Sequence, residues 1–135
     1  MLIDLINQVK SVNALAPTNL IASVQGTYQD FSNCKISTGA IVDVGNYGSN
    51  TTNLQVQIEE SSLTNSGFVA IPNMTVSGIA GSGHTVVRGQ RTHRYLRANA
   101  ISVQGATPSV YCSVEVIAEL EYAGSGGGYS RSPSS

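Results

Sequence analysis

Apolar and polar residues alternate along the middle of the chain, and this alternation predicts β-strands. In residues 54–59 every second side chain is Leu, Val or Ile, and the side chains between them are Gln or Glu. A period of two places the two kinds of residue on opposite faces of an extended strand. After the turn-forming run SSLTNSG, residues 68–71 resume a short strand that Pro72 is expected to end. The segment therefore predicts a β-hairpin with one apolar face and one wet, polar face.

The clearest strand is the last one, residues 110–122. The residues that share its apolar face are Val110, Cys112, Val114, Val116, Ala118 and Leu120. Ile117 is the one apolar residue that interrupts the opposite, polar face. Cys112 is therefore expected to be a small core residue, and a disulfide with Cys34 would require the two strands to be neighbours.

Eight strands are expected in all, separated by segments rich in Gly, Asn and Ser. They cover residues 20–25, 33–36, 40–44, 54–60, 68–71, 84–89, 95–103 and 110–122. Short strands at this spacing predict an all-β fold, namely an antiparallel two-sheet β-sandwich that is jelly-roll-like.

The two ends of the chain differ from the middle. Residues 1–17 carry Leu, Ile and Val at a loose spacing of three to four, which fits a short amphipathic helix ending before Pro17 or an extended arm on a neighbouring subunit. Because a helix this short is marginal in water, either form needs a partner surface. Residues 123–135 are a Gly/Ser-rich tail. We therefore expect an N-terminal arm (1–17), a β-sandwich domain (18–122) and a C-terminal tail (123–135).

Composition narrows the class of partner. The 135 residues are 41% hydrophobic and only 11% charged, with a net charge of −1, which is typical of one folded domain without bulk attraction to nucleic acid or anionic membranes. The N-terminus has an acid at position 4 and no basic leader, so no signal peptide is expected. No stretch is long and apolar enough to span a membrane. We expect synthesis in a reducing cytoplasm, where the sequons at Asn50 and Asn73 stay unused.

Candidate chemistry is sparse. His84 and His93 flank an expected strand without the spacing of a metal site, and the glycine-rich run 78–84 lacks the lysine and following helix of a phosphate-binding loop. The chain contains no GxSxG nucleophile elbow. The expectation is a protein that is not an enzyme and uses no cofactor, no metal and no small-molecule substrate.

The one concentration of charge is an arginine-rich run, VVRGQRTHRYLR. Its arginines are Arg88, Arg91, Arg94 and Arg97. Because a strand places odd and even positions on opposite faces, the run does not form one basic stripe. Two interpretations stay open: the arginines dock acidic groups of a protein partner, or they pair within the chain with Glu59, Glu60 or Glu115.

The strand residues resemble those of a known family. VQIEES, the linker SLTNSG, FVAIP and, after a Gly-rich gap, HRYLRANAISVQG are similar to segments that recur in small structural proteins of tailed bacteriophages. AIVDVGNYGS, at residues 40–49, is similar to the strand and turn that precede them. The resemblance covers about residues 40–120 and concerns strand residues, not a catalytic signature.

The resemblance implies a capsid decoration, or cement, protein. Such a protein binds the outer surface of the phage head and stabilises the shell against internal DNA pressure. The implied partners are the major capsid protein and further copies of the chain, as a homotrimer. The implied location is the outer capsid surface of the virion, after synthesis in the host cytoplasm.

On this interpretation the arm and the arginines make the contacts with the capsid or a neighbouring subunit. The expected contact residues are Leu2, Ile3, Leu5, Ile6, Val9, Arg88, Arg91, Arg94 and Arg97. Two alternatives stay open. One is a tail or neck structural β-sandwich of a phage particle. The other is a carbohydrate-binding β-sandwich, whose candidate sugar-stacking residues are Tyr28, Tyr47, Tyr111 and Tyr129.

Overall fold

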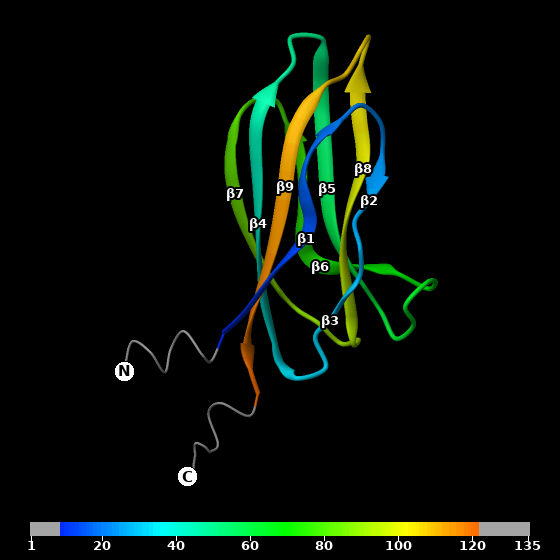
Figure 1. Cartoon of the computed structure of the whole chain (residues 1–135), viewed down its shortest axis with the longest axis vertical. Helices are drawn as coiled ribbons and strands as arrows, with labels where there is room; N and C mark the ends of the chain where they lie inside the picture. Colours follow the sequence, from blue (N-terminus) through cyan, green and yellow to red (C-terminus); the bar gives the residue numbers. More distant parts are fainter. Residues whose placement is uncertain (1–8, 122–135) are drawn as a thin grey trace.

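The computed structural model describes residues 9–121, which form two antiparallel sheets stacked in a sandwich (Figure 1). The strands are β1 (Val9–Leu20), β2 (Val24–Gln25), β3 (Gln29–Asp30), β4 (Cys34–Tyr47), β5 (Thr51–Ser61), β6 (Val69–Ile79), β7 (Gly83–Gln90), β8 (Tyr95–Gly105) and β9 (Val110–Leu120). The predicted all-β sandwich is confirmed. The described residues form nine strands where about eight were expected, because β1 and β3 were not predicted as strands and the two strands expected at 33–36 and 40–44 are the single strand β4.

The strand order is that of a jelly roll. Sheet A runs β1-β9-β4-β7, and sheet B runs β2-β8-β5-β6, with β3 also pairing with β8. The first strand, β1, therefore pairs with the last strand, β9. Strands β2 and β3 pair with β8, β4 pairs with β7, and β5 and β6 form the central hairpin of this nested series. A long antiparallel ribbon that pairs in this nested way and folds over into two layers is a jelly roll.

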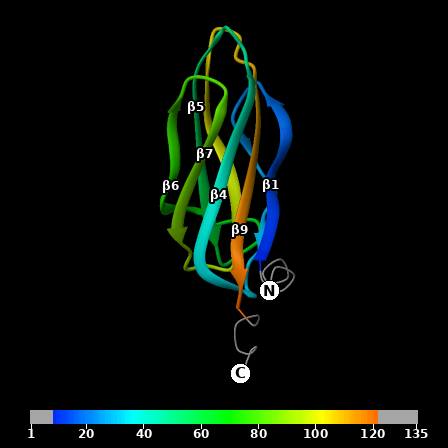
Figure 2. The same cartoon turned by 90° about the vertical axis from the view of Figure 1, so that its left-hand side faces the viewer.

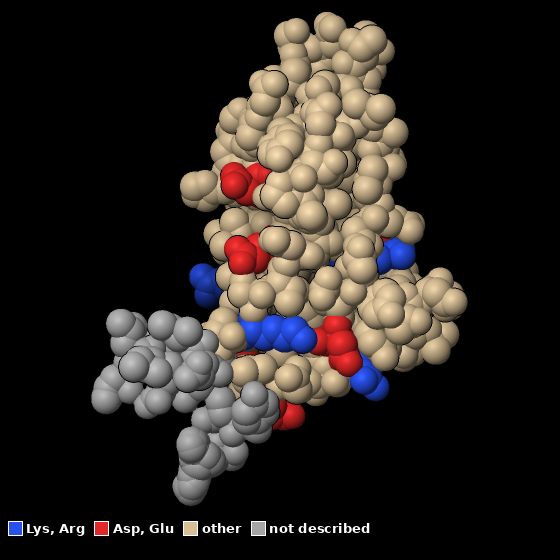
Figure 3. Space-filling view, viewed as in Figure 1, with Lys and Arg blue, Asp and Glu red and all other residues tan. Residues whose placement is uncertain are grey.

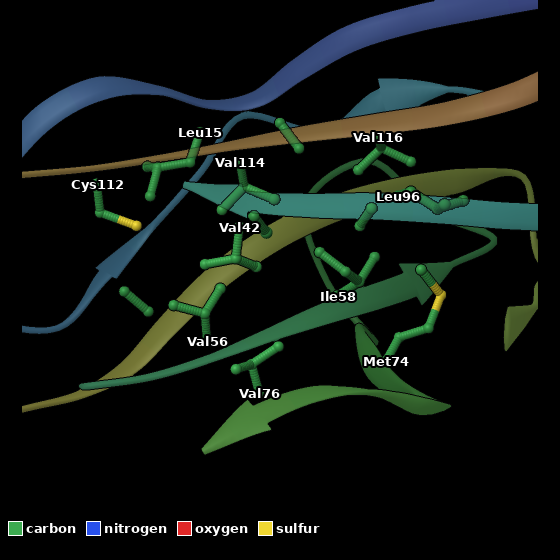
Figure 4. Close-up of a cluster of buried hydrophobic side chains, with 14 of the residues drawn as sticks. Leu15, Val42, Val56, Ile58, Met74, Val76, Leu96, Cys112, Val114 and Val116 are labelled. Atoms are coloured by element: carbon green, nitrogen blue, oxygen red, sulfur yellow. The ribbon is translucent and has the colours of Figure 1, made fainter. Parts of the chain in front are cut away.

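The core lies between the sheets and follows the alternation in the sequence. Val42 and Val114 from sheet A face Val56, Ile58 and Leu96 from sheet B (Figure 4). Each of these five side chains is at most 1% exposed. Complete burial of one such side chain contributes about 1.5–3 kcal/mol, so the row of alternating apolar residues provides the main driving force for folding. Cys112 belongs to this core, as predicted, and Cys34 and Cys112 are both buried free thiols.

Residues 9–17 do not form the helix that their spacing allowed. They belong to β1, which pairs with β9 from Val9 opposite Glu119 to Leu20 opposite Val110. Two register shifts between Asn13 and Thr18 accommodate Pro17, which cannot donate a ladder hydrogen bond. The sandwich therefore includes residues 9–17, which were expected to belong to the arm, and residues 1–8 of the predicted arm lie outside the described residues.

Strand β6 continues past Pro72, which was expected to end it. Ala70 pairs with Glu59 and Thr75 with Gln57, so four residues of β6 stand opposite the single residue Ile58. Pro72 lies inside this bulge, where no ladder hydrogen bond is required. The next residue, Asn73, has a φ of 68°, a left-handed conformation that asparagine tolerates.

Three other strand predictions changed in extent. The separate strands expected at 33–36 and 40–44 are one strand, β4, with a register shift between Cys34 and Thr38. Of the strand expected at 20–25, only Val24 and Gln25 pair with β8, because Leu20 ends β1. The hairpin of β5 and β6 is confirmed, and the polar residues at its end are described below.

Candidate partner-binding surface

Most of the charged residues lie toward one end of the sandwich. Figure 3 shows most of the Lys, Arg, Asp and Glu side chains of this face toward the end where the described chain begins and ends, with acidic side chains also near the middle of the molecule. The loops at the opposite end, residues 21–23, 48–50, 80–82 and 106–109, contain no charged residue. Val9 and Glu119 are a register pair, so the chain enters and leaves the domain side by side at the charged end.

The four predicted arginines do not form one patch. Arg91 is only 9% exposed, and its guanidinium donates hydrogen bonds to the carbonyl oxygens of Lys35 (3.4 Å), His93 (3.0 Å) and Cys34. These bonds join the β7–β8 loop to the start of β4. Arg91 is thus positioned to hold the fold together, and its donors are not directed at a partner.

Arg97 lies on the outer face of sheet B in a cross-strand pair with Glu59. Its Nε is 2.8 Å from Glu59 Oε1, and its guanidinium lies 4.1 Å from the centre of the Phe68 ring. Glu59 also accepts hydrogen bonds from Asn99 (3.0 Å) and Gln57 (2.5 Å). Glu59 is only 5% exposed, so the face of the hairpin that was expected to be wet is closed at this point. This is the intrachain pairing that the sequence left open as an alternative.

Glu60 lies on the inner side of β5, at the end of the core. It accepts hydrogen bonds from the backbone N–H groups of Thr92 (2.6 Å) and His93 (3.0 Å) and from the Thr92 hydroxyl (2.9 Å). Sequence analysis placed Glu59 and Glu60 among possible partners of the arginines but did not foresee that both are buried. The sequence did contain a signal for this. Glu59 and Glu60 are consecutive residues near the end of a strand with strict alternation, and consecutive residues of a strand point to opposite faces, so one of the two acids must point toward the core.

Arg94 and Asp30 form the exposed part of the charged end. Arg94 Nε and Nη2 lie 3.0 Å and 2.8 Å from the two carboxylate oxygens of Asp30, a bidentate geometry. The guanidinium lies 5.1 Å from the centre of the Tyr95 ring, and Tyr95 packs edge-to-face against Tyr28 at 5.4 Å. Tyr28 is 43% exposed. We call Tyr28, Asp30, Arg94 and Tyr95 the Tyr28 cluster.

Three carboxyl groups at this end have lowered pKa values. Burial alone would raise the pKa of Glu59 and of Glu60, but their hydrogen bonds, led by Asn99 and by Thr92 respectively, outweigh it. The hydrogen bond from Arg94 holds the pKa of Asp30 well below its usual range. A carboxyl whose pKa is lower in the folded state stabilises the fold above its unfolded pKa, and this contribution is lost as the pH falls.

The free energy of unfolding is therefore expected to be constant near neutral pH and to fall steadily below about pH 4.5, the ordinary value for glutamate. Urea unfolding followed by circular dichroism from pH 7 to pH 2 checks this. Glu59→Gln should reduce the acid dependence, because one of the three groups no longer titrates. A variant with the same pH slope as the wild type would contradict the assignment.

The other predicted contacts are separate from this cluster. Arg88 is exposed on β7, on the outer face of sheet A, and Val9 is the first residue of β1 and 37% exposed. Leu2, Ile3, Leu5 and Ile6 lie outside the described residues. Of the tyrosines considered for sugar binding, Tyr47 donates a hydrogen bond to the Ile79 carbonyl, Tyr111 lies on the outer face of sheet A away from Tyr28, and Tyr129 lies outside the described residues.

Residues 9–121 hold no group of three or more His, Cys, Asp or Glu side chains that could bind a metal ion. Burial raises the pKa of the Cys112 thiol to about 11, so this cysteine is a core residue and not a nucleophile. No helix among the described residues is long and apolar enough to cross a membrane.

Comparison with known proteins supports the fold. No family model matches the chain, and no curated protein matches it significantly. Among solved structures, the crystal structure of the SPBc2 prophage-derived protein YomS is similar, with a TM-score of 0.57 and 10% sequence identity over 82% of this chain and 92% of that one. At this identity the similarity shows a shared fold.

Proposed function

We propose that this protein is a structural component of a phage particle that binds the outer surface of the capsid and stabilises the shell. The jelly roll is an architecture used by viral capsid proteins and lectins. A solved structure with the same fold comes from a prophage. The strand residues from about 40 to 120 resemble those of small structural proteins of tailed bacteriophages, which implies a capsid decoration protein. These three observations agree on a phage structural role, and the capsid is the partner that the resemblance names.

The observation that carries the proposal furthest is the placement of the N-terminal end. The described chain starts at Val9, beside Glu119 and at the same end of the sandwich as the Tyr28 cluster. Residues 1–8 contain the apolar residues Leu2, Ile3, Leu5 and Ile6, and an extended segment of eight residues reaches about 26 Å. A single site on the shell could then bind the N-terminal arm and the rigid surface of the Tyr28 cluster at the same time.

The surface of the Tyr28 cluster has the composition of a protein-binding site. Tyr and Arg are enriched in the energetically important centres of interfaces. Arg94 is held in place by Asp30 and Tyr95, so little side-chain entropy would be lost on binding. Glu59 accepts a hydrogen bond from Arg97, and Glu60 accepts one from the backbone N–H of Thr92. These bonds fix the segments around the Tyr28 cluster, so little further ordering would be needed on binding.

Deleting residues 2–8 is expected to abolish retention on capsids while leaving the sandwich folded. The deletion stops before β1, because removing residues up to 12 would also break four rungs of the β1–β9 ladder. The measurement is co-sedimentation of the full chain and the deletion variant with empty, expanded capsids of the cognate major capsid protein, with circular dichroism as the folding control. Equal occupancy of the two proteins would contradict a role for the arm.

A second variant tests the surface independently of the arm. Tyr28→Ala removes an exposed side chain with little effect on the core, and we expect it to weaken capsid binding by about tenfold, or ~1.4 kcal/mol. Tyr111→Ala, at a similarly exposed tyrosine on sheet A, is the matched control. If both variants bind as the wild type does, the Tyr28 cluster is not the contact. If the wild-type protein ignores capsids, the proposed function itself is wrong.

A further inference from the structure

Two hollows adjoin one another at Gln25, in the short strand β2. One lies between residues 13–18 of β1 and residues 25–27 and 29 of the segment that carries β2 and β3, and its volume is about 560 Å³. The other lies where β2 pairs with β8 and has a volume of about 450 Å³. Both volumes are in the range of small-molecule sites in proteins, about 300–1,000 Å³. The residues that line the second hollow are Ser23, Val24, Gln25, Asn99 and Ile101.

The walls of the larger hollow are held together at Gly26. Its N–H donates a hydrogen bond to the Ala98 carbonyl (2.7 Å), and a Cβ atom at this position would overlap the carbonyl oxygen of Ala14 on β1. The backbones of the two sheet edges therefore meet directly here, with no room for a side chain between them. Beside this contact, β1 shifts register twice between Asn13 and Thr18, and such irregularities bend a strand. Because the hollow is part of the folded framework, a ligand would need little ordering of the protein to bind.

Two amide side chains at the site each keep one hydrogen-bonding group unused. Asn99 Nδ2 donates to Glu59 Oε2 at 3.0 Å. Gln25 Oε1 accepts from Arg97 Nη1 at 3.3 Å. The remaining acceptor, Asn99 Oδ1, and the remaining donor, Gln25 Nε2, have no hydrogen-bond partner within residues 9–121, and the two residues are a register pair on neighbouring strands. Because a hydroxyl group both donates and accepts, two adjacent hydroxyls of one ligand would satisfy both groups.

The residues that line the two hollows also restrict the charge of a ligand. Of the described residues, none that lines either hollow is charged. The neighbouring charges of Arg97 and Glu59 already pair with each other at 2.8 Å. A phosphate or carboxylate would therefore lose hydration without meeting a free cation, and a wholly apolar ligand would cover the two amides without partners. The ligand class that fits is neutral and rich in hydroxyl groups.

We propose that the two hollows that adjoin at Gln25 bind a neutral saccharide, with Gln25 and Asn99 bonding to its hydroxyls and Val24 and Ile101 packing against its C–H groups. The jelly roll is also an architecture of lectins. The site shares no residue with the Tyr28 cluster, so the inference does not depend on capsid binding. It also differs from the sugar site considered in the sequence, which relied on tyrosines. Because the polar anchors are few and Gln25 is exposed, we expect a dissociation constant of about 1 mM.

The test is a titration of the full chain followed by ¹H–¹⁵N correlation spectra. The probes are maltose, cellobiose, lactose and N,N′-diacetylchitobiose, each raised to about 20 mM, well above the expected dissociation constant. At least one should produce saturable shifts at residues 23–25 and 99–101. Glucose 6-phosphate and N-acetyl-triglycine amide, which represent a charged sugar and a peptide, should leave these signals unchanged. The absence of saturable shifts with all four disaccharides, or equally tight binding of either comparison probe, would overturn the proposal.

Gln25→Glu provides a second readout, because it keeps the oxygen that accepts from Arg97 and removes the Nε2 donor. It should weaken saccharide binding by about tenfold or more with an unchanged unfolding temperature, since Gln25 is exposed. The matched control is Gln90→Glu, at the exposed end of β7 and at the opposite edge of sheet A from β1 (Figure 2), which should bind as the wild type does. A Q25E variant that binds like the wild type, or equal losses in Q25E and Q90E, would overturn the proposal. No capsid is used, so failure here and failure of the proposed function can be told apart.

Discussion

Replacing Arg91 with methionine is expected to lower the free energy of unfolding by about 2–4 kcal/mol. The guanidinium donates to three backbone carbonyls, from Cys34, Lys35 and His93, in a position that is 9% exposed. Methionine fills similar space but donates nothing, so these acceptors lose their partners. Chemical denaturation at neutral pH measures the change.

The same replacement at Arg88 is the matched control. Arg88 is exposed, so Arg88→Met should change the free energy of unfolding by less than about 0.5 kcal/mol. Arg91→Lys should recover only part of the loss, because one ammonium group cannot span carbonyls of two segments. If R91M is as stable as R88M and has instead lost capsid binding, Arg91 would be a contact residue, as the sequence first suggested, and not a structural one.

Replacing Gly105 with alanine is expected to cost about 2–6 kcal/mol. Gly105 has a φ of 142°, which costs a residue with a side chain about 1–3 kcal/mol. The added Cβ would also lie 2.0 Å from the carbonyl oxygen of Asn50, and relieving such overpacking costs about 1–3 kcal/mol more. Thermal unfolding of G105A beside Gly81→Ala, a glycine in open space, measures the difference.

This position matters for the fold because Gly105 pairs with Thr51, where β8 ends beside the start of β5. The charge-free end of the sandwich is closed by the chain reversals on either side of this pair. Equal stability of G105A and G81A would show that the backbone here can relax, and the close approach of the two strands would then not be a constraint on the fold.

The strands that sequence analysis predicted best are those with one buried and one exposed face. In β9 the alternation of Val114 and Val116 with Glu115 specifies both the strand and its orientation. The helix or arm expected at residues 9–17 shows where this reasoning weakens. Residues at a sheet edge alternate less strictly, and Val9 pairs with Glu119, more than a hundred residues away. A partner so distant in sequence leaves no local signal.

The candidate surface was less predictable than the fold for the same reason. The arginine run was recognised, but Arg91, Arg94 and Arg97 each have a different partner, and these partners come from β4, β3 and β5. Which arginine is buried depends on the register between strands, and the register follows from the whole topology. The Tyr28 cluster joins β3 to β8 and likewise has no signature in a single stretch of sequence.

The central claim is that the jelly roll is a structural module of a phage capsid, and a map of the decorated particle tests it most directly. The measurement is an electron cryomicroscopy reconstruction of cognate capsids incubated with the purified full chain. The account predicts density for a two-layered sandwich on the outer surface of the shell, with its charged end, where Val9 and Glu119 lie, facing the capsid. A bare shell, or density at the tail or neck instead, would contradict it.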